Sequence, residues 1–384
     1  MTATNTQKGF ATLTITLVLV SMLVAVSVFI GKVLVSDKRI TLNEIEYRVA
    51  LAAAEKGIAD AMAQLKVNPA ATSVSGSLNT SSSAATYQVT MTPNSPVDNV
   101  WQLLSVATLA NGASTTVSVQ VAERSILNPQ LSGPAAPMVI AGNMPTNGNI
   151  TIVGNPNGGG PGIPISVWSD KVVNLGGSAQ TCGMQEYHSS AGCTKDNAYS
   201  YKAAGGVVVK GKDIIESDIG FPDDLVDYLF GISDGPKAWE TLEKYATEVL
   251  TSCDALNGKA GFFIVEGASS CTLDPMGTKS APVLLVLKDM ELTVNGNGSF
   301  YGLLFAYDSN TSDGTNYKVK LNGNTKFYGA MISNYSEINL PNGNYDSVYD
   351  QDVMCAIAGC NSGSGGGGNP FSRLTTIPGS WKDW

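Results

Sequence analysis

One long apolar segment near the start of the chain restricts the fold more than any other feature of the sequence. The 22 residues from Phe10 to Gly31 contain no charged side chain, and the nine residues before them end in Lys8-Gly9. A helix rises about 1.5 Å per residue, so this segment spans roughly 33 Å, enough to cross the hydrocarbon core of a membrane. We therefore expect a helix that lies in a membrane or packs against other apolar helices.

Two ordinary interpretations fit this segment poorly. A cleaved secretory signal needs a short apolar region and a small-x-small site, but the apolar run continues past Ala25–Ser27 as far as Leu34. A conventional anchor meets a different difficulty, because the positive-inside rule would place the C-terminal part of the chain in the cytoplasm. The positive charges that follow the segment are Lys32, Lys38 and Arg39.

The cysteines argue against a cytoplasmic location. Six cysteines form three couples of near neighbours, which predicts three disulfides that each close a short loop. Other connectivities are open, and local pairing is the interpretation that we favour. The expected pairs are Cys182–Cys193, Cys253–Cys271 and Cys355–Cys360. Disulfides of this kind imply the periplasm or the cell exterior.

The composition excludes several classes of function. Charged residues make up 14% of the chain, against roughly 25% in an average soluble protein. The net charge of −9 disfavours nucleic-acid binding, which needs a basic face. His188 is the single histidine, so triad and zinc chemistry lack their usual residue, and a solvated loop position is the simpler interpretation. We expect no enzyme activity and no cofactor.

The N-terminal residues resemble a known processing signal. Lys8-Gly9 followed by Phe10 and an apolar run is similar to the class III signal of type IV pilins and type II secretion pseudopilins. The stretch RVALAAAEKGIADAMAQL at 48–65 resembles the second half of the N-terminal helix in the PilX family of minor pilins, with GspK-like tip pseudopilins as close relatives. The resemblance covers roughly residues 8–67. It implies cleavage by a prepilin peptidase between Gly9 and Phe10, N-methylation of Phe10, and an uncleaved helix that later packs in a filament core.

One departure from the family pattern bears on position in the filament. Major pilins carry a glutamate at the fifth mature position, which counted from Phe10 is Thr14. In the family that glutamate pairs with the amino terminus of a neighbouring subunit, because a buried charge without a partner is unfavourable. A subunit at the very tip has no such neighbour. The resemblance and Thr14 together imply a tip position.

The chain beyond the membrane segment predicts an α+β protein. Apolar residues from Leu51 to Leu65 recur at spacings of three and four, which predicts an amphipathic continuation of the helix that ends near Pro69. Three β-rich runs at 86–92, 100–110 and 114–124 predict a small antiparallel sheet. The expected divisions are a leader at 1–9, a transmembrane or filament-core half-helix at 10–34, an amphipathic half-helix at 35–69, a small sheet at 70–124, a linker at 125–137 and a large mainly β domain at 138–384.

A repeated phrase organises the large domain. Asn-Gly-Asn followed by a short apolar strand occurs near residues 147, 295, 322 and 342, which favours a solenoid-like or layered domain over independent hairpins. Two helical patterns, each with a proline near its start, predict an insertion at about 222–250. We expect Cys253–Cys271 to connect the second helix to the strand GFFIVEG, and Trp381 or Trp384 to pack on the solenoid.

A short polar loop offers a weak metal-site candidate. Asp308, Asn310, Ser312 and Asp313 place oxygen ligands at alternate positions, as calcium loops do. An EF-hand needs glycine at the sixth place and glutamate at the twelfth, but Asp313 and Val319 stand there. An ordinary polar turn is the simpler interpretation, and calcium is the alternative.

The resemblance implies a non-catalytic minor pilin that primes assembly of a type IV pilus and stays at its tip. The implied partners are other minor pilins, the major pilin, the inner-membrane assembly platform, the prepilin peptidase and a tip adhesin. The precursor would lie in the inner membrane facing the periplasm, and the mature subunit at the pilus tip on the cell surface. Two alternatives remain open: a GspK-like pseudopilin of a type II secretion system, and a membrane-anchored adhesin that binds glycan or a surface through its C-terminal domain.

Overall fold

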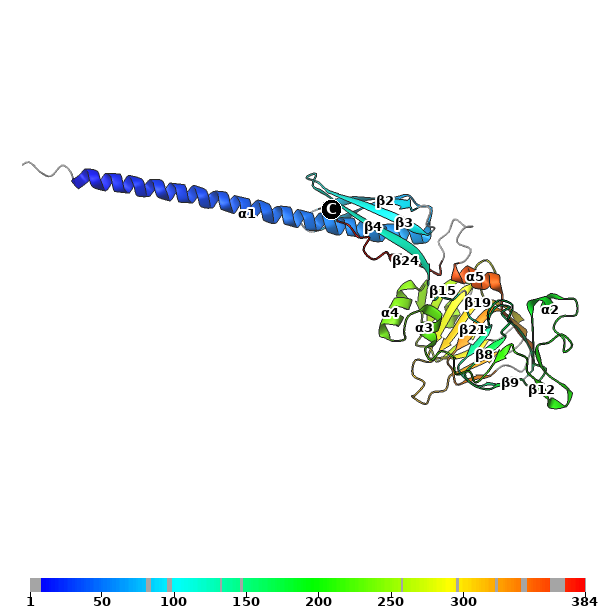
Figure 1. The fold of residues 1–384 in the computed structure, drawn as a ribbon. Coiled ribbons are helices and arrows are strands. Elements are labelled where there is room, and N and C mark those ends of the chain that lie inside the picture. Colours follow the sequence, from blue (N-terminus) through cyan, green and yellow to red (C-terminus); the bar gives the residue numbers. More distant parts are fainter. Residues whose placement is uncertain are drawn as a thin grey trace, which may run out of the picture. The chain divides into compact units, whose positions relative to one another are not determined.

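The computed structural model divides the chain into two compact units (Figure 1). Unit 1 contains Met1–Leu65, Ala70–Ala122 and Thr376–Trp384, and unit 2 contains Lys66–Pro69 and Glu123–Thr375. The structure describes residues 8–80, 84–94, 99–131, 133–145, 148–256, 258–294, 297–321, 324–339, 344–359 and 370–383.

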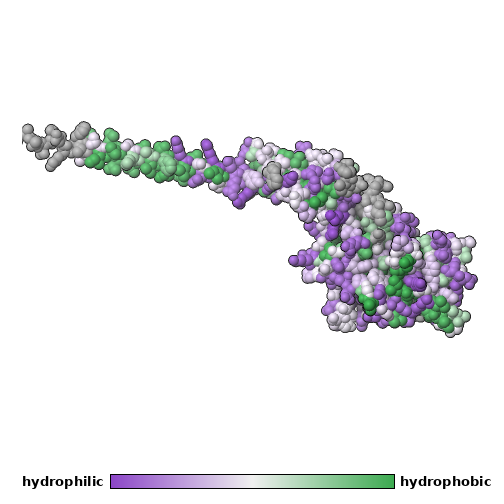
Figure 2. Space-filling view, in the orientation of Figure 1, coloured by the Kyte–Doolittle hydropathy of each residue, from purple (hydrophilic) through white to green (hydrophobic). Residues whose placement is uncertain are grey.

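A single helix, α1 (Lys8–Val67), runs through the first part of unit 1. Its N-terminal half exposes a continuous apolar surface, visible as the long green stretch of Figure 2. Among the described residues, this is the one helix long and apolar enough to cross a membrane. The second half buries one face against the sheet, as the spacing predicted. The buried residues are Ala50, Ala53, Ala54, Ile58, Ala61 and Leu65.

The sheet of unit 1 is larger than the sequence predicted. Its order is β1-β2-β3-β4-β24, and β1 to β4 are antiparallel neighbours. The three predicted strands are present, but β1 and β24 were missed. The strands are β1 (Ser73–Asn79), β2 (Ala84–Pro93), β3 (Val100–Leu109), β4 (Ser114–Ser125) and β24 (Ser372–Thr376).

The helix and the sheet of unit 1 approach each other closely at a glycine. A Cβ atom on Gly57 would lie 2.6 Å from Ser105 Oγ and 2.9 Å from a ring carbon of Tyr87, so only glycine fits there. Beside it, Lys56 Nζ lies 2.9 Å from an Asp60 carboxylate oxygen and 2.9 Å from the Tyr87 hydroxyl, which itself donates to Asp60. Polar contacts therefore fix the same helix turn that the glycine brings close to the sheet.

Unit 2 is built mainly from parallel strands. Its larger sheet is formed by β5 (Met138–Ile140), β7 (Asn149–Val153), β8 (Val167–Ser169), β10 (Gln180–Cys182), β11 (Ser200–Lys202), β12 (Val208–Val209), β13 (Ile214–Ile215), β14 (Glu248–Leu250), β15 (Gly261–Val265), β17 (Val283–Lys288), β19 (Asn297–Tyr307), β21 (Asn324–Ser333) and β23 (Asn344–Val348). A second sheet contains β16 (Ser270–Leu273), β18 (Glu291–Val294), β20 (Lys318–Leu321) and β22 (Glu337–Asn339), and a small pair contains β6 (Met144–Pro145) and β9 (Val173–Asn174).

Short helices complete unit 2. They are α2 (Met184–His188), η1 (Ala204–Gly206), α3 (Leu225–Phe230), α4 (Pro236–Tyr245), η2 (Cys253–Leu256) and α5 (Gln351–Ala358). From β15 to β23 the chain alternates between the larger sheet and the second sheet, and each strand pairs in parallel with its successor in the same sheet. One core fills the space between the two sheets, and another lies between the larger sheet and α3, α4 and α5. The expected large, mainly β domain with few helices is confirmed.

The repeated Asn-Gly-Asn phrases align in neighbouring strands. Asn344 pairs in register with Asn324 on one side and with Asn149 on the other. Asn149 Nδ2 donates to Asn344 Oδ1, and Asn344 Nδ2 donates to Asn324 Oδ1, both at 2.9 Å. The repeat therefore corresponds to an asparagine ladder across three strands. The apolar part of the phrase stacks as well, with ring centroids 4.4 Å apart for Phe300 and Phe327 and 4.8 Å apart for Tyr301 and Tyr328.

The larger sheet forks at β21. Residues 324–328 of this strand pair with β23, whereas Met331–Ser333 pair with β5 on the way to β8. The strands β8, β5, β21 and β19 therefore lie side by side and parallel, and their carboxyl ends lie along one edge of the sheet. This edge lies past the residues of β21 that pair with β23. Ligand sites of parallel sheets commonly occur at such edges and switch points.

The C-terminal end of the chain differs from the expectation. The predicted domain 138–384 is interrupted, because residues 376–384 belong to unit 1. Trp381, expected to pack on the large β domain, belongs to unit 1 and is 42% exposed, and Trp384 lies outside the described residues. Lys382 forms an antiparallel bridge with Ser118 of β4, through two backbone hydrogen bonds of 2.8 and 2.9 Å.

Candidate functional site

The predicted processing residues lie at the start of α1. Gly9 and Phe10 have helical backbone, and their side chains lie outside the described set. Cleavage between them and methylation of Phe10 stay predictions. Thr14 is exposed on the apolar half of the helix, where the family pattern has its glutamate.

Unit 2 contains a cleft of about 630 Å³ at the carboxyl ends of β5, β8, β19 and β21. The N-terminal end of α3 and the loop before α4 complete its wall. Its charged lining consists of five carboxylates and one ammonium, and we call it the acidic cleft. These residues are Asp170, Lys171, Asp223, Asp224, Asp234 and Asp308.

Neutral donors hold two of the carboxylates in fixed orientations. Asp224 caps α3 by accepting from the backbone N–H of Asp227 at 2.8 Å, and it also accepts from the backbone N–H of Asp234 at 2.8 Å. Asp234 in turn accepts from the indole N–H of Trp239 at 3.0 Å and from the hydroxyl of Tyr307. Asp224 is thus the N-cap of α3.

The candidate calcium loop lies partly in this cleft. Asp308 lines it, whereas the oxygens of the loop are largely engaged with the loop's own backbone. Asp308 accepts from Asn310 N–H, Asn310 from Ser312 N–H, and Asp313 from Thr315 N–H. In the described part of the chain no three acidic, histidine or cysteine side chains are grouped so that they could hold a metal ion. The polar-turn interpretation agrees with this geometry.

Burial and neighbouring charge act on the ionisation of the cleft. Burial raises the pKa of the Asp308 carboxyl above its ordinary value, and the carboxylates of Asp289 and Asp313 add to that effect. Burial also raises the pKa of the Tyr307 hydroxyl, which the hydrogen bond to Asp234 raises further. With five carboxylates against one ammonium in its lining, the cleft carries a net negative charge.

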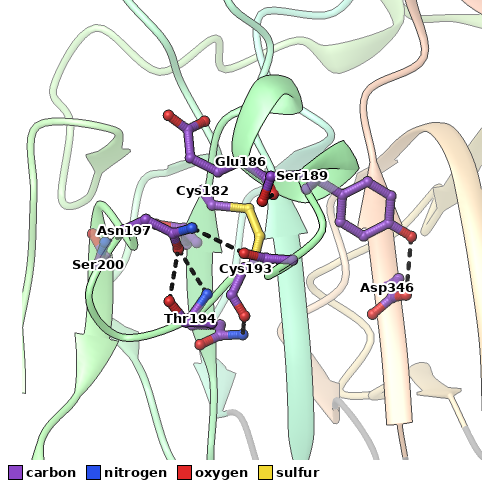
Figure 3. Close-up of a disulfide and its surroundings, with 12 residues drawn as sticks. Cys182, Glu186, Ser189, Cys193, Thr194, Asn197, Ser200 and Asp346 are labelled. Carbon is purple, nitrogen blue, oxygen red and sulfur yellow. Dashed lines mark hydrogen bonds between the residues drawn. A yellow bond between two sulfur atoms is a disulfide. The ribbon is translucent and has the colours of Figure 1, made fainter.

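Two predicted disulfides are present in unit 2. Figure 3 shows Cys182 joined to Cys193, a bond that closes the α2 loop, where the Asn197 side chain donates to the carbonyl of Gly192. His188 lies in this loop and is exposed, as expected.

The second disulfide joins Cys253 to Cys271. It connects η2 to β16, not to the strand GFFIVEG (β15) as predicted, because the chain crosses to the second sheet before it reaches Cys271. Cys355 is disulfide-bonded, and its predicted partner Cys360 lies outside the described residues.

Sequence reasoning missed most of the cleft. Asp170 and Asp234 were not singled out, and Asp308 was considered only as a metal ligand. A signal was present, because Asp170 and Asp308 each follow directly on a short β run that ends a strand, as VWSD and FAYD. What the sequence could not show is that β5, β8, β19 and β21 become neighbours.

The chain combines one long helix, apolar and exposed over its first half, with a β-rich remainder, as the resemblance to type IV pilins predicted. The sequence profile described as PilX N-terminal matches residues 8–59. Over those residues the chain is similar to the PilX family, as the leader and the alanine-rich helix predicted. The profile covers only a small part of the chain.

Other comparisons add little. No curated protein matches the sequence. The crystal structure of the competence-associated pilin ComZ from Thermus thermophilus aligns over 88% of this chain and 97% of its own, with 11% identity and a TM-score of 0.25. A TM-score of 0.25 does not show that the two chains share a fold.

Proposed function

We propose that the protein is a minor pilin that primes assembly of a type IV pilus and stays at its tip. The observation that carries the proposal is the PilX-type segment at 8–59 in an exposed helix that has Thr14 where other pilins have glutamate. In this proposal prepilin peptidase cuts after Gly9, and Phe10 is N-methylated. The first half of α1 holds the subunit in the inner membrane and then packs against other minor pilins and the major pilin.

The size of unit 2 supports an end position. It contains Glu123–Thr375 and, in addition, the four residues 66–69. It is therefore much larger than the sheet that packs on α1. A domain of that size is difficult to repeat along a closely packed shaft. At the tip it needs room on one side only. The role is structural, with the assembly platform of the inner membrane and a tip adhesin as further partners.

Four experiments test the proposal. Mass spectrometry of the mature protein should find a chain that starts at methylated Phe10, and Gly9→Val should leave the leader attached and abolish piliation. Immunogold labelling should place the protein at the ends of filaments. Label spread evenly along the shaft would contradict the tip position, and a deletion that stops secretion but leaves pili intact would favour a type II secretion pseudopilin.

A further inference from the structure

A hairpin of unit 2 carries a group of exposed aliphatic side chains. The strands β11 and β12 are its two arms, and residues 203–207 connect them. We call residues 203–209 the valine loop. Val207 is 62% exposed, and Val208 and Val209 are each 38% exposed. Figure 2 shows a green patch at the lower right, where Figure 1 labels β12. Exposed apolar side chains that cluster, unlike single ones, often mark a binding surface.

Lysine residues flank the valine loop on both sides. Lys202 ends β11, and Lys210 and Lys212 follow β12. The ammonium of Lys210 lies 2.7 Å from a carboxylate oxygen of Glu216, so its charge is compensated. Lys202 and Lys212 form no ion pair in the described part of the chain. Two uncompensated positive charges therefore lie beside the aliphatic residues.

This local charge is opposite in sign to that of the whole protein. Residues 197–212 contain three lysines and no acidic residue, whereas the chain has a net charge of −9. The next acid, Asp213, is buried and accepts a hydrogen bond from the Ser200 hydroxyl at 2.7 Å. A surface complementary to the hairpin is therefore apolar where it meets the valines and negatively charged around them.

The hairpin supplies hydrogen bonds to its own backbone. Its two arms pair as antiparallel strands. In the connection, Ala203 N–H donates to the carbonyl of Val207 at 2.7 Å, and Gly206 N–H donates to the carbonyl of Ala203 at 3.2 Å. A segment that moves from water into lipid must satisfy its backbone polar groups internally. The valine loop therefore loses fewer hydrogen bonds on leaving water than an open loop would.

A lipid bilayer fits this combination better than a protein partner does. Protein interfaces usually centre on tryptophan, tyrosine or arginine, and residues 203–212 contain none of these. The strand β12 has two residues, and edge strands this short offer little backbone for a partner strand to pair with. Anionic bilayers bind segments that combine aliphatic side chains with lysine, because the long lysine stem lets the ammonium reach lipid phosphates.

We propose that the valine loop inserts shallowly into an anionic phospholipid bilayer. Val207, Val208 and Val209 enter the upper part of the acyl chains, and Lys202 and Lys212 bind lipid phosphates. The inference concerns the hairpin of unit 2 alone, so it does not rest on leader processing or on a position at the pilus tip.

Flotation with lipid vesicles tests the proposal on the full chain. The chain is placed in nanodiscs of phosphatidylcholine, which cover the apolar half of α1, and is mixed with phosphatidylcholine vesicles that contain or lack phosphatidylglycerol. We expect the nanodiscs to float with the anionic vesicles and not with the neutral ones, and added salt should weaken the binding. Transfer of α1 between membranes would carry the chain to both kinds of vesicle, and equal flotation with both would overturn the proposal.

Matched variants test the assignment to the hairpin. Val208→Asp should lower the affinity for anionic vesicles about tenfold, because it removes apolar contact and adds a charge that phosphates repel. Val249→Asp is the control and should bind like the natural chain, since Val249 is 40% exposed on β14, at the opposite end of the strand order from β12. Lys212→Gln should lower the affinity about fivefold, whereas Lys237→Gln on α4 should not change it.

A fluorescent label distinguishes insertion from adsorption. Ala204 is exposed in the valine loop, so a nitrobenzoxadiazole dye attached through Ala204→Cys should brighten and shift to the blue when anionic vesicles are added. A dye that stays in water while the chain floats would contradict insertion.

Three further outcomes would overturn the proposal. They are absence of flotation with anionic vesicles, an equal loss of affinity in Val208→Asp and Val249→Asp, and self-association without vesicles that Val208→Asp abolishes, which would assign the loop to a contact between copies. Thermal unfolding checks that Val208→Asp stays folded, and its melting temperature should match that of the natural chain because the side chain is exposed. None of these results bears on leader cleavage or filament labelling.

Discussion

At the scale of single residues, the structure explains positions that have no special mark in the sequence. Gly57 reads as one more small residue of an alanine-rich helix, yet Ser105 Oγ lies only 2.6 Å from the position that its Cβ would take. Tyr87 reads as a strand residue, yet its hydroxyl donates to Asp60 across 27 positions of the chain. The buried alternation of Val117, Val119 and Val121 was predictable, because local period alone determines it. Contacts between the helix and the sheet depend on how the two elements are aligned, and the local spacing of apolar residues does not determine that alignment.

The contact between Asp60 and Tyr87 leads to a pH prediction. The hydrogen bond from Tyr87 and that from Lys56 lower the pKa of Asp60 below its ordinary value of 3.8. A lowered pKa means that the folded state prefers the carboxylate, so the stabilisation is present above that ordinary value and is lost as the pH falls through the lowered pKa. Asp60→Asn should therefore reduce the melting temperature modestly at neutral pH, and the difference should shrink in acid.

Thermal melts of the full chain and of Asp60→Asn, from neutral pH to below the ordinary carboxyl pKa of 3.8, check the prediction. Glu55→Gln is a suitable control, because Glu55 is exposed on the same helix. A difference between the natural chain and Asp60→Asn that stays constant down to the most acidic sample would show that the carboxylate has no such role.

At the scale of elements, the repeated phrase was the most informative signal in the large domain. Asn-Gly-Asn marks the start of β19, β21, β23 and β7, and the register of these strands follows from it. The sequence could not show that β7 lies beside β23, because the two asparagines are 195 residues apart. It also could not show the fork at β21, since a strand that pairs with β23 by one half and β5 by the other has no local signature.

The asparagine ladder gives a prediction at this scale. Asn344→Ala breaks two side-chain hydrogen bonds, whereas Asn149→Ala and Asn324→Ala each break one of the two. With about 1 kcal/mol for each bond, Asn344→Ala should lower the free energy of unfolding by about twice as much as either neighbour. Chemical denaturation of the three variants measures this ratio. Equal losses of unfolding free energy in all three would mean that the hydrogen bonds between the asparagine side chains do not stabilise the sheet.

At the scale of the whole molecule, the order of the units along the chain departs from a simple succession of domains. The helix and the strands β2, β3 and β4 of unit 1 were recognisable, but residues 376–384 also belong to it. The glycine-rich stretch NSGSGGGGNP at 361–370 gave no sign of this connection. Such a composition predicts a flexible link without indicating which part of the chain the link leads to.

Removal of residues 377–384, the C-terminal segment that belongs to unit 1, tests the role of that segment. The backbone of Ser118 exchanges two hydrogen bonds with Lys382, and Ile377 N–H donates to Gln120 at 2.9 Å, so this segment pairs with β4. Deletion of residues 377–384 should leave part of that strand unpaired and promote self-association, which light scattering detects. Trp381→Ala keeps the backbone and should stay like the natural chain. A deletion variant that remains monodisperse and equally stable would show that the edge needs no cover.

Because Lys382 bridges to Ser118, the order of synthesis acquires a consequence. The ribosome releases the last residues of unit 1 only after all of unit 2 has been translated. The first sheet therefore keeps an unpaired border until translation has finished. A chain cut short by premature termination would keep that border open, which gives quality control a means to distinguish full-length chains from truncated ones.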